Sequence, residues 1–160
     1  MTPPQTFSPP TDSARSAQMA LVRSRDTKPE MRVRRALHAA GLRYRLHDRR
    51  LPGSPDLVFP SRRVALFVHG CFWHRHMGCS AARLPKSRLE FWESKLSGNV
   101  SRDKRQHVAL EAAGWTVLVV WECETRNTAA LSALAQKILA IDPTIATRAS
   151  PREGGRARKR

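Results

Sequence analysis

A chain of 160 residues has room for one domain with a buried core and for tails. Its formal net charge is +16, and the last ten residues carry only +4 of this, so the folded part is basic as well. A phosphate backbone is the commonest partner of such a chain, although an RNA or an anionic membrane surface would also attract it. No apolar run approaches the roughly 20 residues of a membrane span. Residues 1–20 also lack a signal-peptide core, so we expect a cytoplasmic protein with no membrane partner.

The first predicted element is a helix that follows an unstructured arm. Residues 1–15 are rich in Pro, Ser and Thr, a composition typical of disorder. Thr27 and Glu30 form a capping-box pattern with Pro29 in the first turn, and Gly41 ends the helix. The apolar residues at helical spacing between them are Val33, Leu37 and Ala40.

Three strands are predicted next. Residues 42–46 alternate between apolar and polar side chains, as a half-buried strand does. A Pro- and Gly-containing turn at residues 51–55 leads into a buried strand that begins at Asp56, and residues 64–68 form the third strand. The short connection at residues 60–63 favours an antiparallel pair of the second and third strands.

Two helices are predicted after this, separated by a break at Gly98-Asn99. Ser87 and Glu90 form a second capping box that would open the first of these helices. The second runs to Gly114 and has a sparse apolar stripe, made of Val100, Val108 and Ala112.

The last elements are a strand and a helix. Residues 115–121 are Val-rich and predict the central strand of the sheet, and Asn127 is a suitable cap for a final helix. Its inward-facing residues are expected to be Leu131, Leu134, Ile138 and Leu139. The order of elements predicts an α/β sandwich around a mixed sheet.

A zinc site is predicted from three cysteines and one histidine. Cys71, His76 and Cys79 have the spacing of one arm of such a site, and Cys123 is the fourth candidate ligand. The alternative is that the cysteines are small buried hydrophobic residues and His76 lies on the surface. Four protein ligands leave no position for water, so the zinc would be structural rather than catalytic.

Asp56, His69 and His74 are candidate catalytic residues. An Asp at a strand start in a basic protein suggests a magnesium ligand for phosphodiester cleavage, although Pro-Asp is also common in turns. No carboxylate occurs between Leu57 and Ser87, so the usual second acidic ligand is missing. Either histidine suits acid–base chemistry near neutral pH, with a hydrogen-bonded structural role as the alternative.

Large aromatic side chains accompany these residues. Phe72 and Trp73 are adjacent, and both cannot point into one core if the loop is held by zinc. An exposed aromatic in a basic protein suggests stacking on bases or wedging between them. Trp92 has helix packing as an alternative role, and Met19 is either a wedge or part of the N-terminal arm.

These residues occur in four motifs that resemble the very short patch repair (Vsr) endonucleases. The similarity runs from about residue 16 to residue 126. The motifs are Pro55-Asp56, Phe67-Val68-His69-Gly70-Cys71-Phe72-Trp73-His74, Glu90-Phe91-Trp92 and Val120-Trp121-Glu122-Cys123. The resemblance implies a restriction-endonuclease-like fold, a mixed central sheet flanked by helices, and a structural zinc. It also implies magnesium-dependent nicking of one DNA strand 5′ of the thymine in T:G mismatches, which arise by deamination of 5-methylcytosine.

The resemblance also implies roles for single residues. Asp56 would bind magnesium with the backbone carbonyl of Val68, which replaces a threonine of some members. His74 would be the base that activates water. The supporting catalytic residues would be His69 and Glu30. The positions that hold metal-bound waters would be Asn99 and Asp103. The DNA wedge would consist of Met19, Phe72, Trp73 and Trp92.

We therefore expect an endonuclease domain at residues 16–141, between a disordered arm at 1–15 and a basic, disordered tail at 142–160. Its partner would be double-stranded DNA with a T:G mismatch, and a monomer suffices to nick one strand. A functional link to a cytosine-5 DNA methyltransferase and a nucleoid-associated location follow from the same resemblance. Two other functions remain open: a zinc-stabilised DNA-binding module without catalysis, and a restriction-type nuclease not specific for mismatches.

Overall fold

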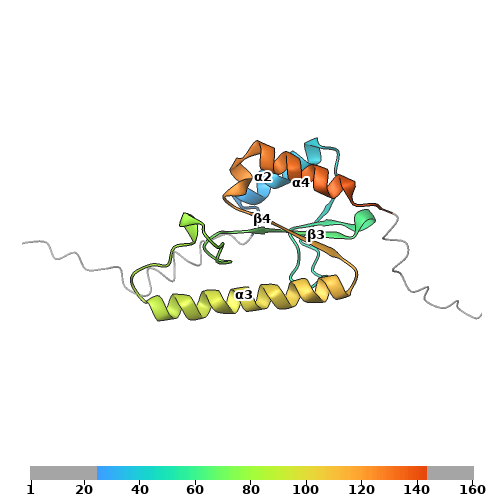
Figure 1. Cartoon of the computed structure of the whole chain (residues 1–160). Coiled ribbons are helices and arrows are strands. Elements are labelled where there is room, and N and C mark those ends of the chain that lie inside the picture. Colours follow the sequence, from blue (N-terminus) through green and yellow to red (C-terminus); the bar gives the residue numbers. More distant parts are fainter. Residues whose placement is uncertain (1–24, 144–160) are drawn as a thin grey trace, which may run out of the picture.

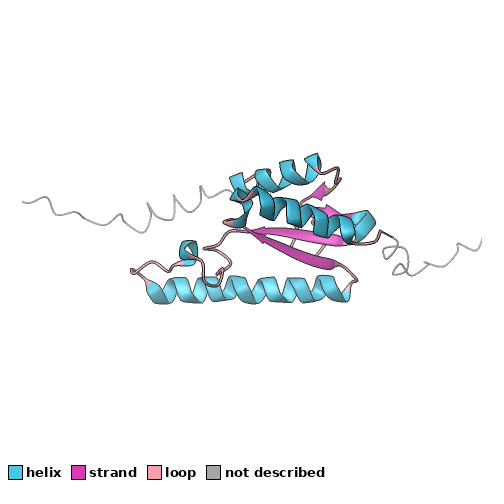
Figure 2. Ribbon diagram, turned by 45° about the horizontal axis from the view of Figure 1, so that its top comes forward, coloured by secondary structure: helices cyan, strands magenta, loops and turns pink. Residues whose placement is uncertain are grey.

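The computed structural model describes residues 25–143, so Met19, the predicted arm at 1–15 and residues 144–160 of the predicted tail lie outside the described residues. A mixed sheet forms the middle of three layers, as Figures 1 and 2 show, with α2 and α4 on one face and α3 on the other. The helices are α2 (Lys28–Ala39), α3 (Leu89–Ala112) and α4 (Thr128–Ala140). Among the described residues, none of the helices has the length and apolar character that a membrane span requires. The α/β sandwich expected from the sequence is confirmed.

Helix α2 begins and ends where the sequence predicts. The Thr27 hydroxyl accepts a hydrogen bond from the Glu30 backbone N–H at 3.4 Å, and Gly41 follows the helix with a φ of +86°. The other half of the capping box is not formed. The Glu30 carboxylate turns into the interior, where it pairs with Arg34.

The sheet has the order β1-β2-β3-β4, which makes β3 an internal strand. Its strands are β1 (Arg45–Leu46), β2 (Leu57–Phe59), β3 (Val64–His69) and β4 (Thr116–Trp121). β2 pairs antiparallel with β1 and with β3, as expected for the second pair, whereas β3 and β4 are parallel. The strand predicted at residues 42–46 is only two residues long, since the left-handed backbone of His47 (φ 47°) follows it directly.

Strand β4 is not the central strand that its composition predicts, because it lies at one edge of the described sheet. Its apolar character has another cause. Leu118 and Val120 pack on the side of α2 and α4, and Val117 and Val119 pack on the side of α3. A strand covered on both faces is apolar throughout, whatever its place in the sheet.

Helix α3 is a single helix of 24 residues, so the predicted break at Gly98-Asn99 is wrong. A glycine inside a helix costs only about 1 kcal/mol relative to alanine, and burial of Leu96 and Leu110 on either side of it offsets that cost. The predicted stripe is also wrong, since Val108 is 64% exposed. Ser87 does not cap the helix, because the cap position falls one residue later, at Arg88.

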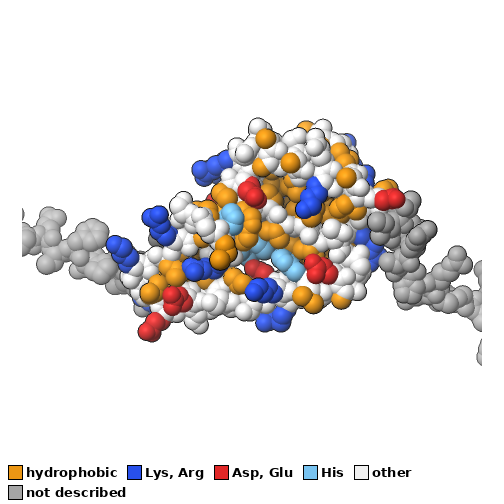
Figure 3. Space-filling view, viewed as in Figure 1, with side chains coloured by type: hydrophobic (Ala, Val, Ile, Leu, Met, Phe, Trp, Pro, Cys, Tyr) orange, Lys and Arg blue, Asp and Glu red, His pale blue; other side chains and the backbone are white. Residues whose placement is uncertain are grey.

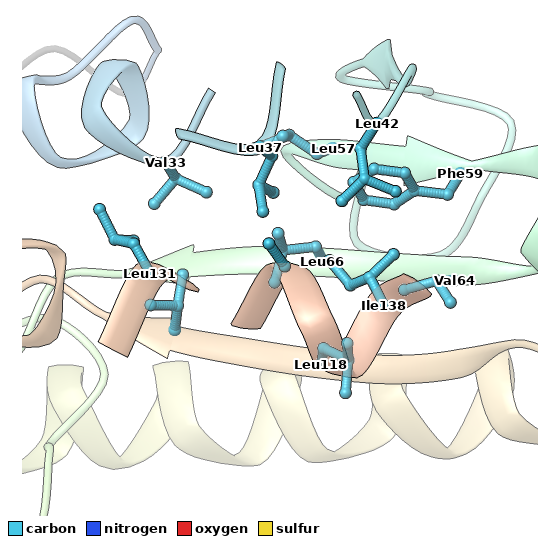
Figure 4. Packing of buried hydrophobic residues seen from close by; sticks show 12 residues of the cluster. Val33, Leu37, Leu42, Leu57, Phe59, Val64, Leu66, Leu118, Leu131 and Ile138 are labelled. Carbon is cyan, nitrogen blue, oxygen red and sulfur yellow. The ribbon is translucent and has the colours of Figure 1, made fainter. Parts of the chain in front are cut away.

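The main core lies between the sheet and helices α2 and α4. Val64 and Leu66 of β3 point into it, and Figure 4 shows them opposite side chains from both helices. The alternate residues of β3, Ala65 and Phe67, point toward α3 and pack around Leu110. Asn127 caps α4 as predicted, by accepting bonds from the N–H groups of residues 129 and 130 at 2.9 and 3.3 Å. Of the residues expected to face inward on α4, Leu139 is 44% exposed, because it follows Ile138 and is turned toward solvent.

We predict that Leu110→Ala lowers the free energy of unfolding by about 2–5 kcal/mol, because it leaves a cavity under the sheet. Val108→Ala, two residues away on the same helix, is the matched control and should change it by less than about 0.5 kcal/mol. Urea unfolding of both variants tests which face of α3 is buried. Similar losses in the two variants would contradict the packing described here.

Candidate active site and cysteine–histidine cluster

A pocket of about 420 Å³ lies where the ends of the strands meet α3. In Figure 3 histidine side chains gather in a hollow between α3 and the rest of the domain. The predicted site residues that line the pocket are Asp56, Val68, His69, His74 and Asp103. Residues that sequence reasoning did not select also line it, among them Arg25, His47, Arg102 and Gln106. The tertiary structure thus brings five of the predicted residues to one place.

Asp56 precedes β2 and is held against β3. Its Oδ2 accepts a hydrogen bond from the backbone N–H of Val68 at 2.7 Å. Burial raises the pKa of the Asp56 carboxyl, and the negative charge of Glu30 raises it further, against the lowering effect of the Val68 bond. A buried carboxylate with a raised pKa is stabilised by a cation, which fits a role for Asp56 as a metal ligand.

The backbone carbonyl of Val68 faces the same side as Asp56. The carbonyls of Arg63 and His69 accept bonds from residues at the two ends of β4, at 2.7 and 2.9 Å. Backbone groups alternate along a strand, so those of Val68 point toward β2 instead. Since β2 begins at Leu57, opposite Leu66, the ladder ends before Val68. The carbonyl is therefore suitably placed to serve as a ligand beside Asp56.

His74, in the loop after β3, and Asp103, on α3, form a close pair. His74 Nδ1 and Asp103 Oδ2 are 2.6 Å apart. The ring of His69 stacks on that of His74, with centroids 3.9 Å apart and an angle of 10° between the planes. Burial, and then the neighbouring His74, lower the pKa of His69 to about 3, so its imidazole is neutral at physiological pH. These features suit His74 for proton transfer and His69 for packing beneath it.

The buried carboxylate of Glu30 does not line the pocket but contacts His47, which does. Glu30 is 2% exposed and pairs with Arg34, and its Oε1 lies 3.1 Å from Nε2 of His47. His47 Nδ1 is in turn 3.9 Å from Asp56 Oδ1. His47 therefore lies between Glu30 and Asp56. Sequence reasoning missed His47, since its position in a polar, irregular segment gives no local signal.

Asn99 is not among the residues that line the pocket, and it contacts the loop that precedes His74. Its Nδ2 donates a hydrogen bond to the backbone carbonyl of Trp73 at 3.1 Å, and its Oδ1 accepts one from Arg102 at 3.0 Å. The helix thereby holds the residue before His74 in place.

The predicted zinc ligands also come together. The ligand atoms of Cys71, His76, Cys79 and Cys123 all lie within 4.8 Å of one another. His76 Nδ1 is 3.5 Å from the Cys71 Sγ and 3.4 Å from the Cys123 Sγ. Ligands of one tetrahedral zinc lie about 3.5 to 3.8 Å apart, so these distances fit such an ion. Burial is the main cause that raises the pKa of the Cys71 thiol to about 12, so its thiolate requires a compensating cation.

The aromatic residues form one half-exposed cluster beside the pocket. The ring centroids of Phe72 lie 5.2 Å from Trp73 and 5.4 Å from Trp92, and the two tryptophans are 6.2 Å apart. All three side chains are partly exposed, which agrees with the expectation that Phe72 and Trp73 do not both point into one core. The neighbouring Phe91 is 45% exposed and extends the same surface.

Comparison with known proteins identifies the family. The family described as DNA mismatch endonuclease Vsr matches residues 10–80. The type II nicking enzyme V.XorIIP of Xanthomonas oryzae is 55% identical over 126 residues, which cover 79% of this chain and 90% of that protein. The type II nicking enzyme V.NmeAIP of Neisseria meningitidis is 44% identical, with 74% and 84% covered. The DNA mismatch endonuclease Vsr of Escherichia coli is 44% identical, with 72% and 73% covered. The chain therefore belongs to the Vsr endonuclease family.

Proposed function

We propose that this protein is a magnesium-dependent DNA endonuclease that nicks one strand 5′ of the thymine in a T:G mismatch. The observation that carries the proposal is the convergence of Asp56 with the His74–Asp103 pair in one pocket beside the aromatic cluster. The Escherichia coli relative is named a DNA mismatch endonuclease, and other relatives are named nicking enzymes. The net charge of +16 supports binding to a phosphate backbone.

In this proposal Asp56 and the Val68 carbonyl hold magnesium, which when bound stabilises the charge on the attacking and leaving oxygens, with two ions as the expected number. His74 takes a proton from the attacking water through Nε2, because its Nδ1 is engaged by Asp103. Asp103 orients the imidazole and stabilises its protonated form, as carboxylates do in other acid–base pairs. Asp103 lines the same pocket as Asp56, so it would also bind water molecules that surround the ion. His69 and Glu30 support the reaction by packing and charge.

The aromatic cluster of Phe72, Trp73 and Trp92 would wedge into the DNA beside the mismatch, together with Met19 from the N-terminal arm. Opening the base stack costs least at a mispair, which links the wedge to mismatch preference. Asn99 would contribute by fixing the backbone of Trp73. We therefore treat the aromatic cluster as the part of the site that selects the substrate.

We further propose that Cys71, His76, Cys79 and Cys123 bind a structural zinc. It would tie the loop that carries Phe72, Trp73 and His74 to the end of β4. We propose that the protein acts as a monomer in the cytoplasm, at the nucleoid. We also propose a functional link to a cytosine-5 DNA methyltransferase, whose product gives rise to the T:G substrate.

A nicking assay tests the proposal as a whole. Duplexes with a single T:G pair in varied flanking sequences are compared with fully paired duplexes, with magnesium and with a chelator. We expect magnesium-dependent nicking of one strand at T:G. Binding without cleavage would favour a zinc-stabilised DNA-binding module, and cleavage of both strands of paired DNA would favour a restriction-type nuclease.

We predict that Asp56→Ala abolishes nicking and leaves DNA binding largely intact, because binding derives mainly from lysine and arginine contacts to phosphate. Asp56→Asn should also abolish nicking and leave DNA binding intact, although the new amide oxygen can still accept the hydrogen bond from the Val68 N–H. Glu111→Ala, which removes an exposed carboxylate from the far end of α3, should nick normally. Rates and gel-shift affinities are measured together, and substantial residual cleavage by Asp56→Ala would refute the assignment.

We predict that the purified protein contains about one zinc per chain, as a four-ligand structural site requires. Cys123→Ser should lose zinc and melt at a lower temperature, since metal binding is part of the folding free energy of such sites. Ser80→Ala, in the same loop, is a control that should keep both. Elemental analysis that finds no zinc in folded, active protein would overturn the prediction.

We predict that Trp73→Ala lowers affinity for the T:G duplex about 5- to 150-fold, because stacking contributes roughly 1–3 kcal/mol per base. Binding to paired DNA and its salt dependence should change much less. Trp115→Ala, which removes a partly buried tryptophan that packs on the α3 side of the sheet, should reduce stability without changing mismatch preference. If Trp73→Ala behaves in the same way as Trp115→Ala, Trp73 is a packing residue and not a wedge.

A further inference from the structure

His47 lines the pocket, and the proposed reaction assigns it no role. Its side chain is 15% exposed and lies between two carboxylates. Its backbone has a left-handed φ of 47°, and its N–H donates a hydrogen bond to the Asp56 carbonyl at 3.2 Å. The backbone thus fixes His47 directly beside Asp56.

The Nε2 atom of His47 already has neighbours in Glu30 and Arg34. Nε2 lies 3.1 Å from Oε1 of Glu30, and that same oxygen accepts a bond from Arg34. Nη2 of Arg34 lies 2.9 Å from the same Nε2 and can only donate, so Nε2 accepts from Arg34 when the ring hydrogen is on Nδ1 and donates to Glu30 when it is on Nε2. The second tautomer leaves a lone pair on Nδ1, the nitrogen nearer to Asp56.

The other ring nitrogen of His47, Nδ1, lies nearest to Oδ1 of Asp56. Oδ2 of Asp56 is bonded to the Val68 N–H, and Oδ1 lies 3.9 Å from Nδ1 of His47. This distance is too long for a hydrogen bond. Two ligands about 2.1 Å from one ion lie about 3.0 Å apart in adjacent positions and about 4.2 Å apart in opposite ones. The 3.9 Å separation is below the longer of these values, so one cation can contact both atoms, with an angle of about 135° between them at the ion.

We propose that His47 is a direct ligand of the cation at Asp56, through Nδ1, and that Glu30 orients it by accepting the Nε2 hydrogen. Carboxylate–histidine–metal arrangements of this kind are frequent in metalloproteins. The proposal rests on the proposed role of Asp56 as a cation ligand. It also predicts selectivity, because an imidazole ligand strengthens binding of transition-metal cations more than binding of magnesium.

The neighbouring group formed by Asp26, Glu30 and His47 is not itself a metal site. Although their ligand atoms lie within 4.8 Å of one another, Arg34 is bonded to both Asp26 and Glu30. The guanidinium supplies the positive charge that these carboxylates need. The cation is thus expected on the Asp56 side of the imidazole, away from Arg34.

The experiment uses manganese as a spectroscopic probe. It is added to the full-length, zinc-loaded protein in the absence of DNA. Pulsed electron paramagnetic resonance detects a directly bound nitrogen by its modulation of the manganese signal. We expect this modulation in the native protein and its loss in His47→Asn, a substitution that tolerates the left-handed backbone. His38→Asn changes an exposed histidine of α2 and is the matched control, which should keep the modulation.

A titration on the same samples gives the second readout. We expect His47→Asn to weaken manganese binding by about tenfold or more. Competition with magnesium should show a smaller loss for magnesium, so the preference for manganese falls. Thermal unfolding and near-ultraviolet circular dichroism establish that the variant is folded, and His47→Gln provides a second substitution.

The proposal is overturned if His47→Asn keeps the nitrogen modulation, or if the modulation disappears in His74→Asn and persists in His47→Asn. Manganese binding that survives Asp56→Ala would also overturn it, because the ion would then lie elsewhere. None of these measurements uses DNA cleavage. A protein that fails to nick T:G duplexes would refute the proposed function and leave this inference to be decided by the metal data alone.

Discussion

The parallel pairing of β3 with β4 is the constraint on which the rest of the site depends. Parallel strands leave a sheet at the same edge, and the register here places His69 beside Trp121, with the His69 carbonyl bonded to the N–H of Glu122 at 2.9 Å. The chain continues from these ends directly into Cys71 and Cys123. Residues 52 positions apart in the sequence thereby reach one cluster, and stacking of His76 on Trp121, with ring centroids 4.2 Å apart, closes it.

Helix α3 supplies the other wall, and its continuity matters for function. Trp92 near its start packs against the aromatic loop, Asn99 holds the backbone of Trp73, and Asp103 engages His74. Three contacts from one rigid helix fix the distance between the aromatic cluster and the pocket that Asp56 and His74 line. A helix broken at Gly98 would place these contacts on two elements that could move separately. Burial of Leu96 and Leu110 keeps the helix whole and pressed to the sheet.

The charges around Asp56 are consistent with the cation that is proposed to bind there. On the α2 side, Arg34 pairs with Glu30, and on the α3 side, His74 is hydrogen-bonded to Asp103. Oδ1 of Asp56 faces the pocket with His47 Nδ1 at 3.9 Å. Burying an uncompensated carboxylate is costly, and the raised pKa of Asp56 reflects that cost. The cation proposed to bind Asp56 would offset that cost.

The sequence by itself determined the features that depend on nearby residues. Thr27, Gly41 and Asn127 mark helix ends through bonds within a few residues, and the spacing of Cys71, His76 and Cys79 is local in the same sense. The rare residues from His69 to His74 were sufficient to indicate the family.

The tertiary structure alone decided which elements lie side by side. Composition marked β4 as buried but could not show that it lies at the edge of the described sheet, because burial by helices on both faces and a central position leave the same apolar pattern. Glu30 fits a capping box locally, yet its carboxylate is used by Arg34 and His47, whose proximity depends on how α2 packs against the segment before β2. Pairing of this kind depends on contacts between distant residues, and no local spacing encodes it.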